Sequence, residues 1–235
     1  MPSLHSILYT RPSMPPDLLP TSLRDALPGR FIVFDGPDGS GKTTQLTRFA
    51  EAARAAGLDP AVVRDPGGTR VGERIRDLLL EHSDEDIGAR TEMLLYMASR
   101  AQLVALRIAP ALAAGRCVLA DRFYSSTLAY QGTAGGVPAE EILQAALIAC
   151  GAHRPDLTVI FDVDEQTAAS RLSPLLDRME SKGRAFHARV RRGYLDQARN
   201  DPRGVALIDA TRPEDQVFAD LLATLDARLH AGGNA

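Results

Sequence analysis

The stretch "FIVFDGPDGSGKTTQ", residues 31–45, decides the fold of this 235-residue chain. Its four leading apolar residues read as a buried strand, and a glycine-rich segment with one lysine follows directly. Within that segment, "GPDGSGKT" (36–43) matches the pattern G-x-x-x-x-G-K-[ST]. Glycines let such a loop curl so that successive backbone N–H groups point at phosphate oxygens. The stretch therefore predicts a strand, a phosphate-binding loop and a helix that begins near Lys42.

Two side chains of this loop have specific expected roles in binding a nucleoside triphosphate. Lys42 should bridge the β- and γ-phosphates, and the Thr43 hydroxyl should bind Mg²⁺ as cofactor. No N-K-x-D motif for reading guanine is present, which disfavours a GTPase and leaves a kinase or a mechanical ATPase. The residues expected to bind ATP here are Gly36, Pro37, Asp38, Gly39, Ser40, Gly41, Lys42, Thr43 and Thr44.

Short apolar runs recur along the chain, and segments of helical periodicity separate them. Most runs are β-branched and continuous, which is typical of strands buried on both faces of a parallel sheet. Strands that alternate with helices predict an α/β fold: a doubly wound sandwich of the P-loop NTPase type, with a five-stranded parallel sheet flanked by helices. The runs are "FIVF" (31–34), "AVV" (61–63), "CVLA" (117–120), "LTVIF" (157–161) and "VALI" (205–208).

Composition and charge narrow the class of protein. The chain carries 27 basic and 30 acidic side chains, and no dense basic stripe predicts a nucleic-acid partner. No apolar stretch approaches the roughly 20 residues needed to span a membrane. Residues 1–29 are proline-rich and lack the features of a secretory signal, so we expect a disordered or loosely packed extension. Residues 30–235 are expected to form a single domain of a cytoplasmic enzyme.

Polar and glycine-rich segments follow each apolar run, at the edge where a parallel sheet binds ligands. They read "DGPDGSGK", "RDPGGT", "DRFYSS", "DVDE" and "DATRP". This convergence predicts that ligands bind at the carboxyl ends of the strands.

Several of these segments, in their order along the chain, resemble thymidylate kinases. The resemblance runs from about Phe31 to the C-terminus. It implies Mg²⁺-assisted transfer of the ATP γ-phosphoryl group to dTMP, a mobile lid at about 172–183, and a homodimer. The segments that carry it are "DGPDGSGKTTQ" (35–45), "DPGGT" (65–69), "YMASRAQ" (96–102), "DRFYSSTLAYQG" (121–132) and "RLSPLLDRMESKG" (171–183).

The resemblance also implies how dTMP is bound. Asp38 would accept a hydrogen bond from the 3′-hydroxyl, and Tyr96 would stack on thymine. Arg100, one helical turn after Tyr96, would bind a base carbonyl. Arg122 would hold the acceptor phosphate and the transferring group with its planar fork. Further expected substrate-binding residues are Arg64, Ser126, Thr127 and Gln131, with Tyr130 at the edge of the same pocket.

On the donor side, Asp121 is expected to help hold Mg²⁺ or to orient the attacking oxygen. Arg171 matches the family arginine that stacks on adenine. Arg178 is the lid residue expected to neutralise the transferred phosphoryl group. The lid has few arginines, so the transition-state arginine is left open between Arg122 and Arg178. The expected catalytic set is Lys42, Asp121, Arg122 and Arg178.

Two other functions fit the phosphate-binding loop. A deoxynucleoside kinase would phosphorylate a neutral 5′-hydroxyl and would need a base, for which only Asp121 is a clear candidate. An ATPase that drives a partner protein would turn over ATP without any nucleotide acceptor. Supplying thymidine, dTMP or neither separates these functions.

Overall fold

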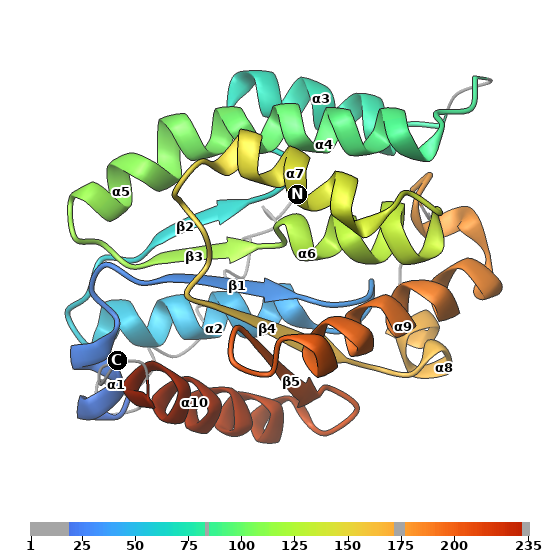
Figure 1. Cartoon of the computed structure of the whole chain (residues 1–235). Helices are drawn as coiled ribbons and strands as arrows, with labels where there is room; N and C mark the ends of the chain where they lie inside the picture. Colours follow the sequence, from blue (N-terminus) through green and yellow to red (C-terminus); the bar gives the residue numbers. More distant parts are fainter. Residues whose placement is uncertain (1–18, 83–84, 172–176, 232–235) are drawn as a thin grey trace, which may run out of the picture.

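The computed structural model describes residues 19–82, 85–171 and 177–231. Within them, five strands form one parallel sheet in the order β2-β3-β1-β4-β5, flanked by helices on both faces (Figure 1). The predicted α/β sandwich is therefore confirmed. The strands are β1 Phe31–Asp35, β2 Ala61–Arg64, β3 Val118–Asp121, β4 Leu157–Asp162 and β5 Val205–Asp209.

The helices cover the sheet in two layers (Figure 1). One layer holds α1, α2 and α10, and the other holds α3, α4, α5 and α7, with α9 beside β4 and β5. The α-helices are α1 Thr21–Ala26, α2 Lys42–Ala55, α3 Arg70–Leu80, α4 Ala89–Leu103, α5 Ala109–Ala113, α6 Tyr124–Thr127, α7 Ala139–Cys150, α8 Glu165–Arg171, α9 Arg184–Asn200 and α10 Glu214–Ala231, with π-helical η2 Val104–Ile108 and η3 Leu128–Ala134 and the 3-10 turn η4 Glu180–Lys182.

Strand β1 lies at the centre of the sheet and is buried throughout. Ile32 and Phe34 point into the core beneath α2 and α10, where the Phe34 ring stacks on that of Phe161 at 5.9 Å. Phe31 and Val33 point into the opposite core, beneath α4. Burial of both faces explains why the run is continuously apolar. It also fixes the position from which the phosphate-binding loop starts.

Helix α1, which comes first in the described part of the chain, corrects an expectation from the sequence. Leu19, Leu23 and Leu27 are buried in the same core cluster as the apolar face of α10. The Ser22 hydroxyl also donates a hydrogen bond of 2.7 Å to Asp226 of α10. A disordered or loosely packed segment over 1–29 is therefore wrong for residues 19–29, and residues 1–18 lie outside the described part.

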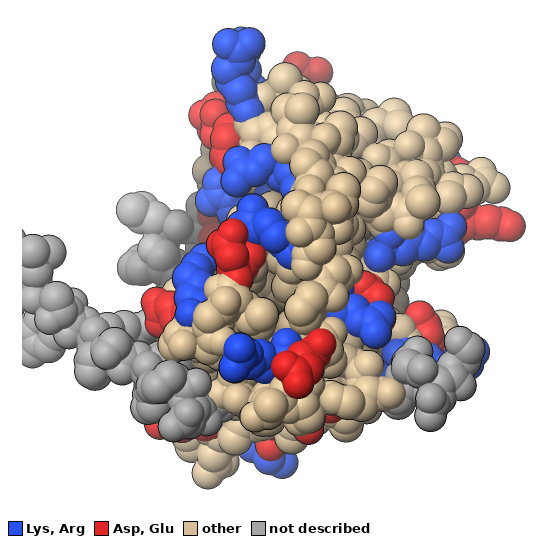
Figure 2. Space-filling view, turned by 90° about the vertical axis from the view of Figure 1, so that its left-hand side faces the viewer, with Lys and Arg blue, Asp and Glu red and all other residues tan. Residues whose placement is uncertain are grey.

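The side where the strands begin carries interspersed basic and acidic side chains (Figure 2). Arg30, just before β1, pairs with Asp156 at 2.9 Å, and Arg116 pairs with Asp59 at 3.0 Å. Among the described residues, no helix is both long and apolar enough to cross a bilayer.

Candidate active site

The phosphate-binding loop follows β1 and leads directly into α2. Gly36 and Gly41 have φ angles of 140° and 80°, which a residue with a Cβ rarely adopts. Gly36 also lies so close to β4 that an added Cβ would stand 2.6 Å from the Phe161 carbonyl oxygen. Helix α2 begins at Lys42, so its unpaired N–H groups face the loop. The Ser40 hydroxyl is buried and has no hydrogen-bond partner among the residues described.

Lys42 and Thr43 lie at the start of α2, where the sequence predicted them. Lys42 is buried, and its Nζ lies 3.4 Å from the Pro37 carbonyl oxygen and 3.9 Å from Asp38. Burial, together with the positive charge of Arg122, lowers the pKa of the Lys42 ammonium group. A ligand phosphate would add further negative charge beside this buried cation.

Thr43 and Asp121 are the candidate magnesium residues, and the fold brings them together. The Thr43 hydroxyl donates a 2.6 Å hydrogen bond to Asp121, which ends β3 opposite the start of the loop. Mg²⁺ prefers oxygen ligands and often takes one or two from protein and the rest from phosphates and water. The described residues contain no cluster of three or more carboxylate, histidine or cysteine ligands. This pair therefore fits a magnesium ion that arrives with a nucleotide.

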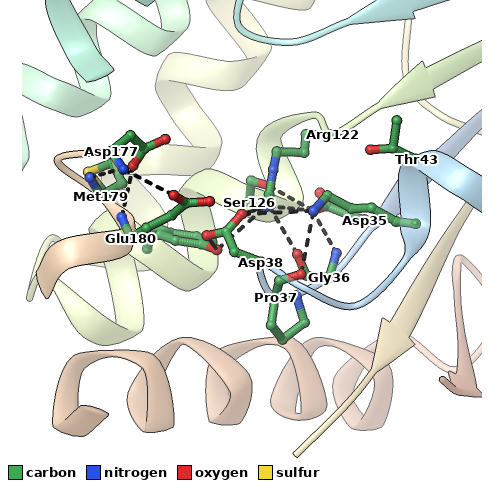
Figure 3. Close-up of polar contacts among 12 residues, drawn as sticks. Asp35, Gly36, Pro37, Asp38, Thr43, Arg122, Ser126, Asp177, Met179 and Glu180 are labelled. Carbon is green, nitrogen blue, oxygen red and sulfur yellow. Dashed lines mark hydrogen bonds and ion pairs between the residues drawn. The ribbon is translucent and has the colours of Figure 1, made fainter. Parts of the chain in front are cut away.

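Arg122 lies at the centre of the site, in contact with the loop. Its backbone φ is 69°, a conformation that costs a non-glycine residue about 1 kcal/mol or more. Its guanidinium group contacts the carboxylates of Asp35 and Asp38, and it donates a 3.0 Å hydrogen bond to the Gly36 carbonyl oxygen and a 2.9 Å bond to Ser126 (Figure 3). These contacts hold a strained arginine with its charge directed at the loop.

Asp38 points from the loop toward Arg122 (Figure 3). It also accepts a 2.6 Å hydrogen bond from the Tyr130 hydroxyl. Burial alone would raise the pKa of Asp38, but the positive charges of Arg122 and Lys42 outweigh it and lower the pKa to about 2. Asp38 is therefore ionised at neutral pH and can only accept hydrogen bonds.

A pocket of about 520 Å³ opens beside Asp38 and Arg122. Every residue predicted to bind the acceptor lines this pocket except Arg64. The fold thus collects residues that are distant in sequence around one pocket. The lining consists of Asp38, Asp65, Pro66, Arg76, Leu80, Tyr96, Arg100, Arg122, Ser126, Thr127, Tyr130, Gln131, Asp177 and Met179.

Arg100 is 1% exposed, and its neighbours fix its orientation. Its Nε donates to Asp65 at 2.5 Å, and its Nη2 donates to the Thr127 hydroxyl at 3.1 Å. Tyr96 lies one turn before it on α4, and burial raises the pKa of its phenol, which keeps the ring neutral. An aromatic ring and a fixed guanidinium group on one helix face suit a planar base with carbonyl groups.

Two predicted residues lie elsewhere. Arg64 donates to Glu73 at 2.9 Å and lines a neighbouring pocket that also includes Thr43 and Asp121. Arg178 donates 2.8 Å hydrogen bonds to Glu92 and to the Leu79 carbonyl oxygen. Arg178 can reach a transferring phosphoryl group only if its hydrogen bonds to Glu92 and to the Leu79 carbonyl oxygen break first. Residues 172–176 of the predicted lid lie outside the described part.

The opposite side of the loop borders a second, larger pocket of about 960 Å³. Arg171 lies there and donates a 2.9 Å hydrogen bond to the Ala210 carbonyl oxygen. Arg171 was predicted to stack on adenine, and the fold places it and Ala210 beside the loop. The lining consists of Gly39, Ser40, Gly41, Thr44, Gln45, Arg171, Ala210, Arg212, Glu214 and Val217.

Arg76 and Tyr194 are among the residues of the acceptor side that the sequence did not predict. Arg76 lines the acceptor pocket and donates a 3.2 Å hydrogen bond to the Pro66 carbonyl oxygen. The i, i+4 spacing of Arg76 and Leu80 places both residues on one face of the helix, and this spacing could have identified Arg76, because Leu80 lines the same pocket. Tyr194 of α9 donates a 2.7 Å hydrogen bond to Asp35, beneath Arg122. No local motif predicts this contact, because Tyr194 and Asp35 are 159 positions apart in the sequence.

The sheet, the loop and two pockets that meet at it define a P-loop nucleotide-binding phosphotransferase. A family model described as thymidylate kinase matches residues 34–221. The chain is 45% identical over 206 residues to a thymidylate kinase of Deinococcus radiodurans, covering 86% of this chain and 98% of that protein. It is 41% identical over 201 residues to a thymidylate kinase of Geobacillus sp. (strain WCH70), covering 84% and 96%.

A solved structure agrees with the sequence relatives. The crystal structure of thymidylate kinase from Ehrlichia chaffeensis matches with a TM-score of 0.66 and 31% identity, covering 83% of this chain and 98% of that one. The chain belongs to the thymidylate kinase family.

Proposed function

We propose that this protein transfers the γ-phosphoryl group of ATP to dTMP, yielding dTDP and ADP. The observation that carries the proposal is the shared loop: Asp38 faces the acceptor pocket, while Gly39 and Gly41 line the donor pocket. In the reaction, a phosphate oxygen of dTMP bonds to the γ-phosphorus as the bond to the β–γ bridging oxygen breaks. Two nucleotides bound from opposite sides would meet at Lys42 and Arg122.

The acceptor pocket offers groups for each part of dTMP. Tyr96 presents its ring to thymine, and Arg100 is fixed where it can bind a base carbonyl. The ionised Asp38 can accept the hydrogen bond of the deoxyribose 3′-hydroxyl. Arg122 and Arg76 supply positive charge for the acceptor phosphate. Ser126, Thr127 and Gln131 complete the polar lining around the base.

On the donor side, the loop amides and Lys42 would cradle the triphosphate, and Arg171 with Ala210 would border adenine. Thr43 and Asp121 would hold Mg²⁺, which when bound neutralises charge on the β- and γ-phosphates. The segment at about 172–183 would close over the phosphates and exclude water. We place the enzyme in the cytoplasm, where ATP, Mg²⁺ and nucleotides are available.

The contacts of Asp121 favour a monophosphate acceptor over a nucleoside. A deoxynucleoside kinase needs a base to remove a proton from a neutral 5′-hydroxyl, and Asp121, the candidate base, accepts a hydrogen bond from Thr43 and is proposed to hold Mg²⁺. The phosphate of dTMP is already largely ionised and needs only positioning and charge neutralisation.

A coupled assay of ADP release tests the proposal. The purified protein is given ATP and Mg²⁺ with dTMP, dUMP, thymidine or no acceptor. We expect rapid turnover with dTMP and background turnover with thymidine or no acceptor. ATP consumption that is equal with and without dTMP contradicts the proposal and favours an ATPase. Omission of Mg²⁺ should remove the dTMP-dependent rate.

We also propose that the protein forms a homodimer through α4 and α7, which pack side by side (Figure 1). Leu94 of α4 is 57% exposed and Ile148 of α7 is 86% exposed, with Leu143 and Leu147 beside it in sequence. Large apolar side chains gathered on adjacent helices are typical of an interface. Light scattering should give a molar mass twice the 25.3 kDa of one chain. The substitution Ile148→Glu should lower the measured mass toward that of the monomer.

A further inference from the structure

Glu92, in the first turn of α4, is a buried carboxylate that the proposed reaction does not use. It is 1% exposed and does not line the acceptor pocket. One oxygen, Oε2, accepts a 2.8 Å hydrogen bond from the side-chain amide of Gln131, which does line the pocket. The other, Oε1, accepts 2.8 Å hydrogen bonds from Arg178 and Lys182.

The charge state of Glu92 follows from these contacts. Burial by itself would raise the pKa of its carboxyl group. Hydrogen bonds from Lys182, Gln131 and Arg178 outweigh burial, so the pKa lies below its usual value. An ionised carboxylate can accept hydrogen bonds but cannot donate them.

This restriction decides how the Gln131 amide is turned. Only its NH₂ group can face the carboxylate, so its carbonyl oxygen is left as the acceptor for a ligand. A thymine ring presents an N–H donor at N3, whereas a cytosine-type ring presents a lone pair there. An amide fixed in this orientation therefore matches thymine and opposes cytosine.

We infer that Glu92 is a positioning residue that fixes the Gln131 amide for reading the N3–H of the base, and that the lid residues Arg178 and Lys182 hold Glu92 in place for this task. The inference rests on the proposed use of this pocket for dTMP. It links two parts of the chain that no sequence motif connects, since Arg178 and Lys182 lie 86 and 90 residues from Glu92.

The same contacts couple the lid to base recognition. If residues 177–182 moved away, Glu92 would remain as a buried charge without its cations, which is strongly unfavourable. A base that bonds correctly to Gln131 supports the ordered arrangement of Glu92, Arg178 and Lys182. A mismatched base would place a lone pair against the Gln131 carbonyl oxygen and would give this arrangement no support.

The decisive variant is Glu92→Gln, because a neutral amide can donate as well as accept and so releases the orientation of Gln131. The probes are dTMP and 5-methyl-dCMP, which differ only at N3 and C4 of the base. We expect the kcat/KM ratio of dTMP to 5-methyl-dCMP to fall about tenfold, mostly through KM, as loss of one oriented hydrogen bond predicts. The KM for ATP should stay unchanged. Asp59→Asn, which breaks the distant ion pair with Arg116, is the matched control and should leave the ratio unchanged.

Lys182→Met provides a second, milder test, because Lys182 is partly exposed and its loss does not open the core. We expect the same ratio to fall by about two- to fivefold, as loss of one of two cations predicts. An unchanged ratio in the variants overturns the inference, as does an equal loss for both nucleotides, which marks Glu92 as a packing residue. Dissociation constants for both nucleotides, measured by calorimetry, give the same ratio without turnover. Failure of wild-type protein to phosphorylate dTMP therefore remains a separate result that counts against the proposed function.

Discussion

The acceptor pocket and the donor pocket meet at the phosphate-binding loop, but different groups build them. On the acceptor side, buried side chains fix one another: Arg100 is held by Asp65, and Arg122 is held by Asp35 and Asp38. On the donor side, the loop offers mainly backbone N–H groups, and Arg171 reaches the site through one hydrogen bond to a backbone carbonyl. The acceptor side is thus ordered by the protein's own side chains, whereas the donor side offers backbone groups to which we expect phosphate to bind.

This difference has a consequence for specificity. Oriented, buried side chains reject ligands that leave them unpaired, because an unmet buried polar group is costly. Backbone amides recognise phosphate in any nucleoside triphosphate. We therefore expect strict selection of the acceptor base and weaker selection of the donor base, and the following changes test that contrast.

The largest effect is expected for Lys42→Ala, because we propose that Lys42 binds the phosphates at the point where the two pockets meet. The turnover number should fall by roughly 10²–10³-fold, as loss of one preorganised charge donor typically causes. Steady-state kinetics with dTMP and ATP measure it. A turnover number near the wild-type value would show that Lys42 takes no part in the mechanism.

Tyr96→Ala tests the acceptor pocket alone. Loss of the stacking ring should raise the KM for dTMP by roughly 10- to 100-fold. The KM for ATP should change little, because Tyr96 lines only the acceptor pocket among the pockets described. Tyr96→Phe keeps the ring and serves as the matched control. If Tyr96→Ala raised the KM for dTMP and the KM for ATP equally, Tyr96 would be a core residue, and the result would not support a difference between the two pockets.

The acid stability of the protein tests how firmly the acceptor side is preorganised. The folded pKa of Asp38, about 2, lies below its usual value of 3.8. Its contribution, about 2 kcal/mol, is therefore present above pH 4 and is lost as pH falls toward 2. Urea unfolding between pH 4.5 and 2.5 measures this, and Asp38→Asn should show a shallower loss. Identical pH slopes would mean that Asp38 is not held by charge.

The smallest effect is expected for Arg171→Ala on the donor side. An exposed cation over a base contributes about 0.5–1 kcal/mol, so the KM for ATP should rise only about two- to fivefold. The KM for dTMP should be unaffected. A rise comparable with that of Tyr96→Ala for dTMP would show that the donor base is recognised as strictly as the acceptor base.

Local chemistry explains what the sequence could predict. The run "FIVF" is continuously apolar because both faces of the central strand are covered. Similar apolar runs located the five strands of the described residues, although Leu207 of the edge strand β5 is 46% exposed. The spacing of Gly36, Gly41 and Lys42 is fixed by loop geometry and is readable in the same way. Most of the acceptor lining was also predicted, through the resemblance to a family.

Contacts between distant segments explain what it could not predict. Tyr194 reaches Asp35, and Glu92 gathers Gln131, Arg178 and Lys182, only after the sheet and helices have assembled. Helix α1 was missed because an isolated helix of six residues is marginal, although the buried Leu19, Leu23 and Leu27 recur every four positions across it. Tertiary burial, rather than local preference, determines these features.

The packing of α1 sets a practical limit on trimming the chain. Leu23 and Leu27 share the core with Leu221 and Leu225 of α10. A truncated chain that starts at Arg30 would expose this leucine-lined seam to water and would be prone to aggregate. Recombinant versions should therefore begin upstream of Leu19, even though the chemistry lies at the opposite edge of the sheet.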